Sequence, residues 1–330
     1  MTGRILLRAA GLISLAVFSL LVPLSPLAYA ADAAQGARLS PSLIELNAAP
    51  GGTYKLTIQV TNVTPGDLLY NVSTADFTAK NETGSPQIIA NANLSPQISV
   101  RSWIAGVPSF QLGSQKMKTV VFTVNVPANA EPGGHYGVIE FSGTQPEING
   151  TGVGLSASTG TLLLVTVAGN IKEQANIASF ATANGKMQTD FFETAPVNFI
   201  TRVQNTGNIH LKPFGSIIVK NIFGSTVATV PVNQDHSNVL PSSIRRFDNS
   251  LDTYMIGPYT ATVTLGYGTQ GHAILATTSF WVVPYKLIAA IIIVLILIIF
   301  IIRRIQRSYN KRVIKKFQKA QKDDTKKTKH

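Results

Sequence analysis

Hydrophobic and polar residues alternate along most of the chain between residues 31 and 283. In residues 54–60, Tyr, Leu, Ile and Val alternate with Lys, Thr and Gln, and the same period of two returns in residues 120–126 and 259–267. This alternation is typical of antiparallel strands that bury one face. No convincing amphipathic helix interrupts it, so the pattern predicts an all-β region.

Turn residues divide this region at short intervals. Gly- and Pro-rich turns stand at residues 50–52, 65–67, 131–134, 206–208 and 257–258. Short strands at this spacing predict β-sandwiches.

The strand pattern also occurs twice. Aligning TIQVTNVTPGDLLYN (57–71) with ITRVQNTGNIHLKPF (200–214) places Val60 on Val203 and Asn62 on Asn205. Later in each half, a Gly/Pro turn precedes a strand that begins with an aromatic residue, in 132–141 and 256–265. We therefore predict two tandem Ig-like antiparallel β-sandwich domains, 31–170 and 171–283.

The stretch VQNTGNIHLKPF (203–214) concentrates polar side chains and could be a ligand site or a strand end. Its recurrence in the first half favours a strand end. We expect Asn205 and Asn208 to cap backbone groups and Gly207 to adopt a positive φ. The two basic residues that follow are expected on the solvent face of the next strand, opposite Ile209 and Leu211: His210 and Lys212.

Both ends of the chain carry membrane-related signals. Arg4 and Arg8, an apolar run and the sequence Ala28-Tyr29-Ala30 predict a signal peptide over residues 1–30, cleaved after Ala30. The segment Leu287 to Ile302 contains no polar residue, which predicts a single transmembrane α-helix over 284–302. Trp281 is expected to lie at the membrane interface beside it.

The net charge of +12 is confined to the ends. The tail 303–330 carries 12 Lys and Arg against Asp323 and Asp324, whereas residues 31–302 are balanced. This distribution indicates a cytoplasmic tail and an extracellular N-terminal part, and it does not indicate nucleic-acid binding. The expected lipid partners of the chain are contacted by Leu287 to Ile302 and by the basic tail. The tail either forms an amphipathic helix on anionic headgroups, with Ile305, Tyr309, Val313 and Phe317 on one side, or is solvated and only fixes topology.

Residues for catalysis or metal binding are not evident. The chain has no cysteine, its five histidines are scattered, and its carboxylates form no recognisable pair. Residues 152–157 match the letters of a dinucleotide-binding loop, but β-like sequence follows them and a hairpin loop explains them better. We predict no enzyme, no cofactor and no catalytic or metal-binding residue. Five N-x-S/T sequons are interpreted as chance in a bacterial ectodomain: Asn62, Asn71, Asn81, Asn93 and Asn149.

Non-catalytic binding is the remaining expectation, with contact residues unknown. The long segments 76–100 and 143–160 are candidate recognition loops, or simply flexible connections. Trp103 could stack on a sugar ring, but its apolar neighbours favour a core position.

The overall layout resembles the WxL-interacting proteins of Gram-positive surfaces. In the first half the resemblance rests on residues 39–64 and 102–143, and in the second on 203–219, 239–247, 257–268 and 277–284. It implies Ig-like domains, the first associated with peptidoglycan and the second with a protein partner. It supplies no contact residues for this chain.

These patterns predict a plasma-membrane protein that binds a peptidoglycan-like cell-wall polymer, a surface partner protein, or both. The alternative is an accessory or scaffold subunit of a membrane transport or secretion complex, and a glycan-processing enzyme is a third possibility. Anchoring by the helix distinguishes this chain from soluble pilus chaperones, whose Ig-like pattern is similar.

Overall fold

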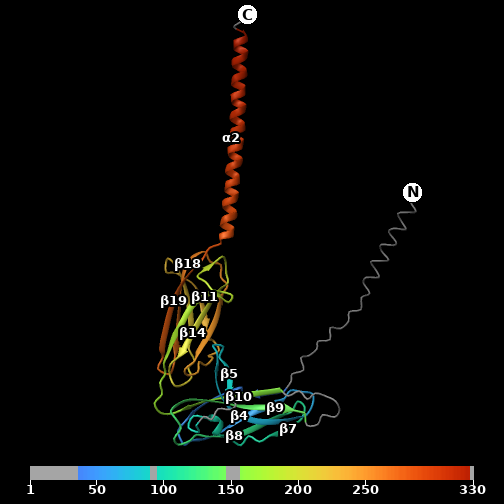
Figure 1. Ribbon diagram of the computed structural model, residues 1–330, viewed down its shortest axis with the longest axis vertical. Helices are drawn as coiled ribbons and strands as arrows, with labels where there is room; N and C mark the ends of the chain where they lie inside the picture. Colours follow the sequence, from blue (N-terminus) through green and yellow to red (C-terminus); the bar gives the residue numbers. More distant parts are fainter. Residues whose placement is uncertain (1–35, 90–94, 146–156, 328–330) are drawn as a thin grey trace, which may run out of the picture.

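The computed structural model describes residues 36–89, 95–145 and 157–327. These residues form four β-sheets followed by one long helix (Figure 1). The predicted signal peptide, residues 1–30, lies outside the described residues, as do residues 152–156 of the dinucleotide-loop match.

Residues 37–167 form two sheets, which we call the N-terminal sheet pair. The smaller sheet contains four strands in the order β1 (Ala37–Ser40), β3 (Thr53–Asn62), β8 (Met117–Asn125) and β6 (Ile104–Ala105). The larger sheet has the order β2 (Leu43–Ala48), β10 (Ala157–Val167), β9 (Gly133–Thr144), β4 (Leu68–Lys80) and β5 (Ser85–Ile89), with β7 (Phe110–Leu112) also beside β4. A short 3-10 helix, η1 (Val100–Ser102), precedes β6.

Residues 175–282 form two further sheets, the C-terminal sheet pair. One has the order β12 (Met187–Gln188), β11 (Ala175–Asn184), β14 (Val197–Asn205) and β17 (Ile244–Leu251). The other has the order β13 (Phe191–Phe192), β19 (His272–Val282), β18 (Gly257–Tyr267), β15 (Phe214–Asn221) and β16 (Thr226–Val232). The α-helix α2 (Tyr285–Lys327) follows β19 directly.

The strand orders of the two sheet pairs correspond. The order β2-β10-β9-β4-β5 matches β13-β19-β18-β15-β16, and β1-β3-β8 matches β11-β14-β17. Val60 and Val203, aligned from sequence, lie on the equivalent strands β3 and β14. The internal repeat predicted from sequence is therefore present in the topology.

The prediction of wholly antiparallel sheets was wrong at two edges. β2 runs parallel to β10, and β13 runs parallel to β19. After β1 pairs with β3 in the first sheet, the chain keeps its direction and crosses to the edge of the facing sheet, where the neighbouring strand runs the same way. The local alternation of residues does not reveal such a crossing.

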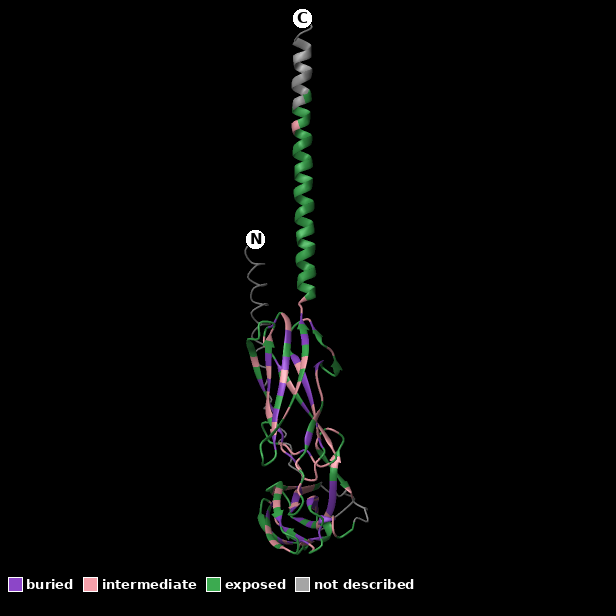
Figure 2. Cartoon of the chain, turned by 90° about the vertical axis from the view of Figure 1, so that its left-hand side faces the viewer, coloured by how far each residue is buried: buried purple, intermediate pink, exposed green. Residues whose placement is uncertain are grey.

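Each sheet pair encloses its own hydrophobic core, visible as buried positions along the strands in Figure 2. The alternating residues predicted to face inward do so: Val120, Phe122 and Val124 are buried in one core, and Val263 and Leu265 in the other. Burial of these side chains is the main stabilising term for a chain without disulfides.

Trp103 belongs to the core of the N-terminal sheet pair, so the core position that the sequence favoured is confirmed. Its side chain is 1% exposed, and its indole Nε1 donates a hydrogen bond to the Pro96 carbonyl oxygen at 2.6 Å. A ring enclosed in this way is not available for stacking on a sugar.

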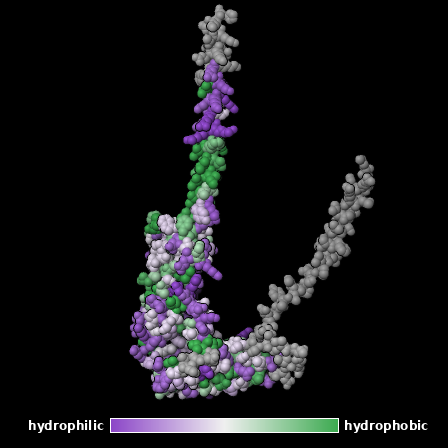
Figure 3. All heavy atoms as spheres, viewed as in Figure 1, coloured by the Kyte–Doolittle hydropathy of each residue, from purple (hydrophilic) through white to green (hydrophobic). Residues whose placement is uncertain are grey.

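Helix α2 spans 43 residues, which is about 64 Å at 1.5 Å per residue. By length and composition, residues Tyr285–Lys316 could cross a membrane, and no part of the most apolar window is buried against the protein. The helix extends well beyond the predicted span of 284–302 and includes most of the basic tail, so the apolar and the hydrophilic halves follow one another along one helix (Figure 3).

The prediction that residues 76–100 form a loop was wrong for its first part. Strand β4 continues to Lys80, and β5 folds back on it through a turn in which Asn81 and Gly84 have positive φ. Residues 76–89 are therefore a hairpin, which reaches from the N-terminal sheet pair toward the C-terminal pair (Figure 1). Of the other candidate loop, 143–160, both ends are strand residues of β9 and β10, and the segment 146–156 lies outside the described residues.

A candidate binding cleft between the sheet pairs

The two sheet pairs meet on the outer face of strands β4, β9 and β10. This face is apolar: Ala75, Phe77, Val138 and Leu164 are buried there, and Leu240 from the C-terminal pair packs against them. Strands covered on both faces read as continuous apolar runs rather than alternating ones, as LLLV in β10 does. The two sheet pairs thus share a small hydrophobic contact of their own.

The β4–β5 hairpin supports this contact from the side. Glu82 in its turn forms an ion pair with Arg202 of β14, and its carbonyl oxygen accepts a hydrogen bond from the Arg246 amide of β17 at 2.8 Å. The hydrogen bonds from Arg202 hold the pKa of Glu82 below its ordinary value, against the opposing effect of burial. The segment proposed from sequence as a recognition loop is thus, in its first part, a brace between the sheet pairs.

Asn205 and Asn62 end equivalent strands, and both are fully buried. The Asn205 Nδ2 donates to the carbonyl oxygens of Ile209 and Val239, and its Oδ1 accepts from the Gly207 amide at 2.9 Å. Asn62 forms the corresponding hydrogen bonds: its Nδ2 donates to three carbonyl oxygens, and its Oδ1 accepts from the Thr64 amide. The capping role predicted for Asn205 is confirmed, and Asn62, for which none was predicted, has the same role in the first half.

Asn208 also caps backbone groups, as predicted. Its Oδ1 accepts from the Lys172 amide at 2.7 Å, and its Nδ2 donates to the Asn170 carbonyl oxygen at 2.8 Å. The positive φ predicted for Gly207 was wrong. Glycine is required there for space, because a Cβ would collide with the Lys172 carbonyl oxygen.

The placement of His210 and Lys212 on a solvent face was wrong. Both lie in the loop between β14 and β15 and face the N-terminal sheet pair. Lys212 Nζ lies 2.7 Å from Glu45 Oε2, and His210 Nδ1 lies 3.4 Å from the hydroxyl of Tyr136. Sequence reasoning missed these contacts because Glu45 is 167 residues from Lys212, and no local pattern encodes such a pairing.

Electrostatics at this junction follow from partial burial. Burial lowers the pKa of His210 from its ordinary value of 6.5, and the nearby Glu45 only partly opposes this. Burial alone would raise the pKa of Glu45, but hydrogen bonds from Lys212 and Asn238 outweigh it, so its pKa is lowered. At neutral pH the junction therefore holds a neutral imidazole beside a Lys–Glu ion pair.

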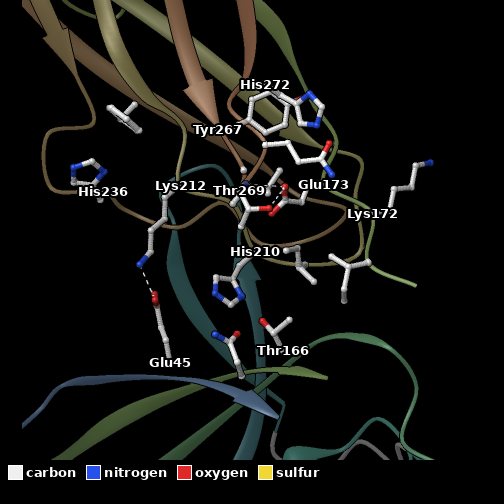
Figure 4. Close-up of a pocket in the computed structure, with 17 residues that line it drawn as sticks. Glu45, Thr166, Lys172, Glu173, His210, Lys212, His236, Tyr267, Thr269 and His272 are labelled. Atoms are coloured by element: carbon white, nitrogen blue, oxygen red, sulfur yellow. Dashed lines mark hydrogen bonds and ion pairs between the residues drawn. The ribbon is translucent and has the colours of Figure 1, made fainter. Parts of the chain in front are cut away.

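Beside this junction lies an open cleft of about 880 Å³, shown in Figure 4. Its floor comes from β2 and β10 of the N-terminal pair, and its walls come from residues 171–173, which connect the two sheet pairs, and from loops of the C-terminal pair. The chemistry-bearing side chains that line it are Glu45, Asn47, Thr166, Lys172, Glu173, His210, Lys212, His236, Tyr267, Thr269, Gln270 and His272.

Several of these side chains are held in place by neighbours. Glu173 accepts hydrogen bonds from the Thr269 amide at 2.8 Å and from its hydroxyl at 3.1 Å. The rings of Phe214 and His236 are 4.8 Å apart, which places an aromatic pair at the rim of the cleft. The cleft thus offers amides, hydroxyls, imidazoles and an exposed aromatic ring on a framework fixed by both sheet pairs.

The structure brings three scattered histidines to one cleft: His210, His236 and His272. His135 lies elsewhere, with its ring nitrogens hydrogen-bonded to the carbonyl oxygens of Ile98 and Glu131. Within residues 36–89, 95–145 and 157–327, no group of three or more His, Cys, Asp or Glu side chains is arranged to hold a metal ion. The cleft is suited to binding a polar ligand through hydrogen bonds and ring contacts.

No protein-family model matches this chain, and no curated protein matches it either. Among solved structures, the Class 5 fimbriae chaperone CfaA is 13% identical over 74% of this chain and 99% of its own, with a TM-score of 0.39. The E. coli chaperone DraB is 14% identical over 74% and 96%, with a TM-score of 0.32. The Pseudomonas aeruginosa chaperone CupB2 is 10% identical over 72% and 97%, with a TM-score of 0.33. All three TM-scores are below 0.5.

Proposed function

We propose that this chain is a membrane-anchored bacterial surface protein that binds a cell-wall polymer of the peptidoglycan type in the cleft between its two sheet pairs. The sheet pairs act as two Ig-like domains, 31–170 and 171–283. The observation that carries the proposal is the cleft itself, which is open, polar and built from both sheet pairs. Binding in it involves no covalent chemistry.

The lining of the cleft matches the chemistry of a glycan with peptide stems. Such a polymer presents hydroxyls, amides, carboxylates and ammonium groups. The cleft presents Asn47, Thr166 and Gln270 for the first two, and Lys172 and Glu173, which lie outside the Glu45–Lys212 ion pair, for the charged groups. The exposed ring of Phe214 offers an apolar surface for a sugar face.

The rigid junction supports this function. A cleft between two loosely linked domains would lose binding free energy to the ordering of its walls. Here the Glu82–Arg202 and Glu45–Lys212 ion pairs and the apolar contact under Leu240 hold the walls in position. In the proposed topology the signal peptide 1–30 is removed, α2 spans the membrane and the basic tail is cytoplasmic.

The test uses the full-length chain in lipid nanodiscs and isolated peptidoglycan sacculi, with bound protein measured by co-sedimentation. Replacing Phe214 and Gln270 together by alanine removes two exposed contacts, and we expect affinity to fall about tenfold. Leu275→Ala, a change at an exposed apolar residue of β19 outside the cleft, should leave affinity unchanged. If the protein does not bind sacculi, the proposal that its ligand is a cell-wall polymer is wrong. If the same cleft instead binds a surface protein, the ligand is a protein partner.

A second function, an accessory subunit of a membrane complex, is favoured by one observation. At about 64 Å, α2 is roughly twice as long as a ~30 Å hydrocarbon core, so several basic turns extend beyond it. Such an extension could contact a cytoplasmic partner. Replacing Leu287 to Ile302 with an unrelated apolar helix, and separately removing the tail, should leave sacculus binding intact if the cleft is the functional site. Loss of a co-purifying membrane partner in either variant would support the accessory role.

A further inference from the structure

Exposed apolar side chains gather at one end of the C-terminal sheet pair, where α2 begins. We call this set the apolar rim, and its members are Met187, Phe191, Ile222, Phe223, Tyr254, Ile256 and Trp281. Figure 3 shows hydrophobic residues at the end of the sheet pair from which the helix leaves. Elsewhere in the described strands and loops, the large apolar side chains that are more than half exposed are Met117, Phe214 and Leu275.

The strand register places the members of the apolar rim at the same end. Phe191 pairs with Trp281 at the last residues of β19, and Gly257, directly after Ile256, pairs with Val282. The turn that contains Ile222 and Phe223 follows Asn221, whose partner is Tyr259 at the start of β18. The β11–β12 turn before Met187 lies beside the start of β14, since Ala183 pairs with Asn198.

The turn at residues 221–225 is closed by hydrogen bonds that do not involve its apolar side chains. The Asn221 Oδ1 accepts hydrogen bonds from the amides of Phe223 and Ser225, both at 3.0 Å, so the turn is closed by its own polar groups. The Phe223 side chain is 83% exposed, and Tyr254 in the neighbouring loop is 81% exposed. Turn tips in water are normally polar, so apolar side chains at adjacent tips indicate an apolar neighbour.

The connection to α2 is too short to hold the apolar rim away from a membrane. Only Val283 and Pro284 separate β19 from α2, and the Val283 amide donates to the Phe192 carbonyl oxygen at 2.8 Å. Lys286 in the first turn of α2 forms an ion pair with Glu193 at 2.6 Å. The start of the helix is therefore tied to the same end of the sheet pair.

We propose that the apolar rim is seated in the headgroup region of the bilayer that α2 crosses, so that the lipid interface is its partner. The proposal rests on membrane insertion of α2. Trp, Tyr and Phe side chains are the residues that partition most readily into this interface. Contact at several turns beside the helix would fix the tilt of the sheet pair and hold the cleft at a defined height above the membrane.

Because the chain contains no cysteine, single cysteines can report the position of each site. Phe223→Cys and Tyr254→Cys are labelled with bimane, and the full-length protein is reconstituted in phosphatidylcholine and phosphatidylglycerol vesicles. Lipids with a nitroxide near the headgroup then quench any label in the interface. Leu275→Cys and Met117→Cys are the exposed controls outside the apolar rim, and Leu295→Cys, tested with a nitroxide deep in the acyl chain, reports the span.

We expect roughly threefold stronger quenching at positions 223 and 254 than at 275 and 117, together with strong deep quenching at 295. If the label at 295 is quenched and those at 223 and 254 match the controls, the apolar rim does not contact the headgroup region, although α2 still spans the membrane. If the label at 295 is not quenched, the membrane-spanning part of the proposed function fails. Adding Ile222→Ser and Phe223→Ser should lower quenching at 254, and an unchanged value would contradict joint seating of the turns.

Discussion

Replacing Asn205 by alanine should destabilise the C-terminal sheet pair strongly. The fully buried side chain satisfies the carbonyl oxygens of Ile209 and Val239, at 2.7 and 2.8 Å, and the amide of Gly207 at 2.9 Å. The Ile209 carbonyl oxygen is then left without a partner, at a cost of about 1–3 kcal/mol. The Val239 carbonyl oxygen keeps a bond from the Leu211 amide and the Gly207 amide keeps one to the Gln174 carbonyl oxygen, so each of these two lost bonds costs about 0.5–1.5 kcal/mol and we expect a total loss of about 2–5 kcal/mol. A domain is stable by only ~5–15 kcal/mol, so this is a large fraction.

Two further variants separate hydrogen bonding from side-chain size. Asn205→Asp keeps the size and the acceptor but loses both donated bonds and directs a negative charge at two carbonyl oxygens, so it should be at least as destabilising as alanine. Asn221→Ala is the control, because that side chain also closes a turn but does so where water can replace it. It should cost less than about 1 kcal/mol.

The measurement is urea unfolding of the full-length chain in detergent micelles, followed by hydrogen-exchange mass spectrometry of peptides from each sheet pair. Asn205→Ala should lower the urea concentration at which peptides from β14 and β18 unfold. Asn62→Ala should do the same for peptides from β3 and β9. If Asn205→Ala moves the midpoint no more than Asn221→Ala does, the structural role assigned to the buried amide is refuted.

Three further predictions concern the junction between the sheet pairs, and all are checked by distance distributions between spin labels placed on the two sheet pairs. Glu82→Gln removes an ion pair whose side chains are about one-third exposed, at 36% and 33%, so it should broaden the distribution while lowering stability by only ~0.5–1 kcal/mol. An unchanged width would contradict the role of the hairpin as a brace. Leu240→Ser removes the apolar cover over Phe77 and Leu164, so it should broaden the distance distribution more than Glu82→Gln does. Leu275→Ser changes an exposed residue, and an equal broadening from it would contradict the role assigned to Leu240. Because burial lowers the pKa of His210, its contribution is fully present above pH 6.5 and is lost as the pH falls from 6.5 through the lowered folded value, so the distribution should broaden at mildly acidic pH. His210→Gln, with Glu45, Lys212 and Tyr136 unchanged around it, should remove that dependence, and its persistence would assign the effect to another group.

The strands and their buried faces could be predicted from the sequence because the information is local. The alternation in residues 54–60, 120–126 and 259–267 decides which side chains face the core, and the burial of Ile58, Phe122 and Val263 follows it. The repeat was equally accessible, because two copies of one strand-end motif can be compared within a single chain.

The cleft and the brace could not be predicted, because both depend on how the two halves pack. Nothing near Lys212 indicates Glu45, and nothing near Glu82 indicates Arg202. One local signal was available for the hairpin: KNETGS at 80–85 is a turn sequence between two segments able to pair. It identifies a hairpin but not the surface that the hairpin contacts.

Departures from the repeat proved more informative than the repeat itself. The asparagine that ends the strand is shared by both halves, since it solves the same backbone problem in each. The residues after it differ: Asn208, His210 and Lys212 have no counterparts of the same type in VTPGDLLYN, and all three lie at the junction. In a tandem repeat, selection for folding acts on both copies alike, whereas a contact between the copies uses different surfaces of each. Polar residues present in one copy and missing from the other are therefore better candidates for an interface or a site than the polar residues that both copies share.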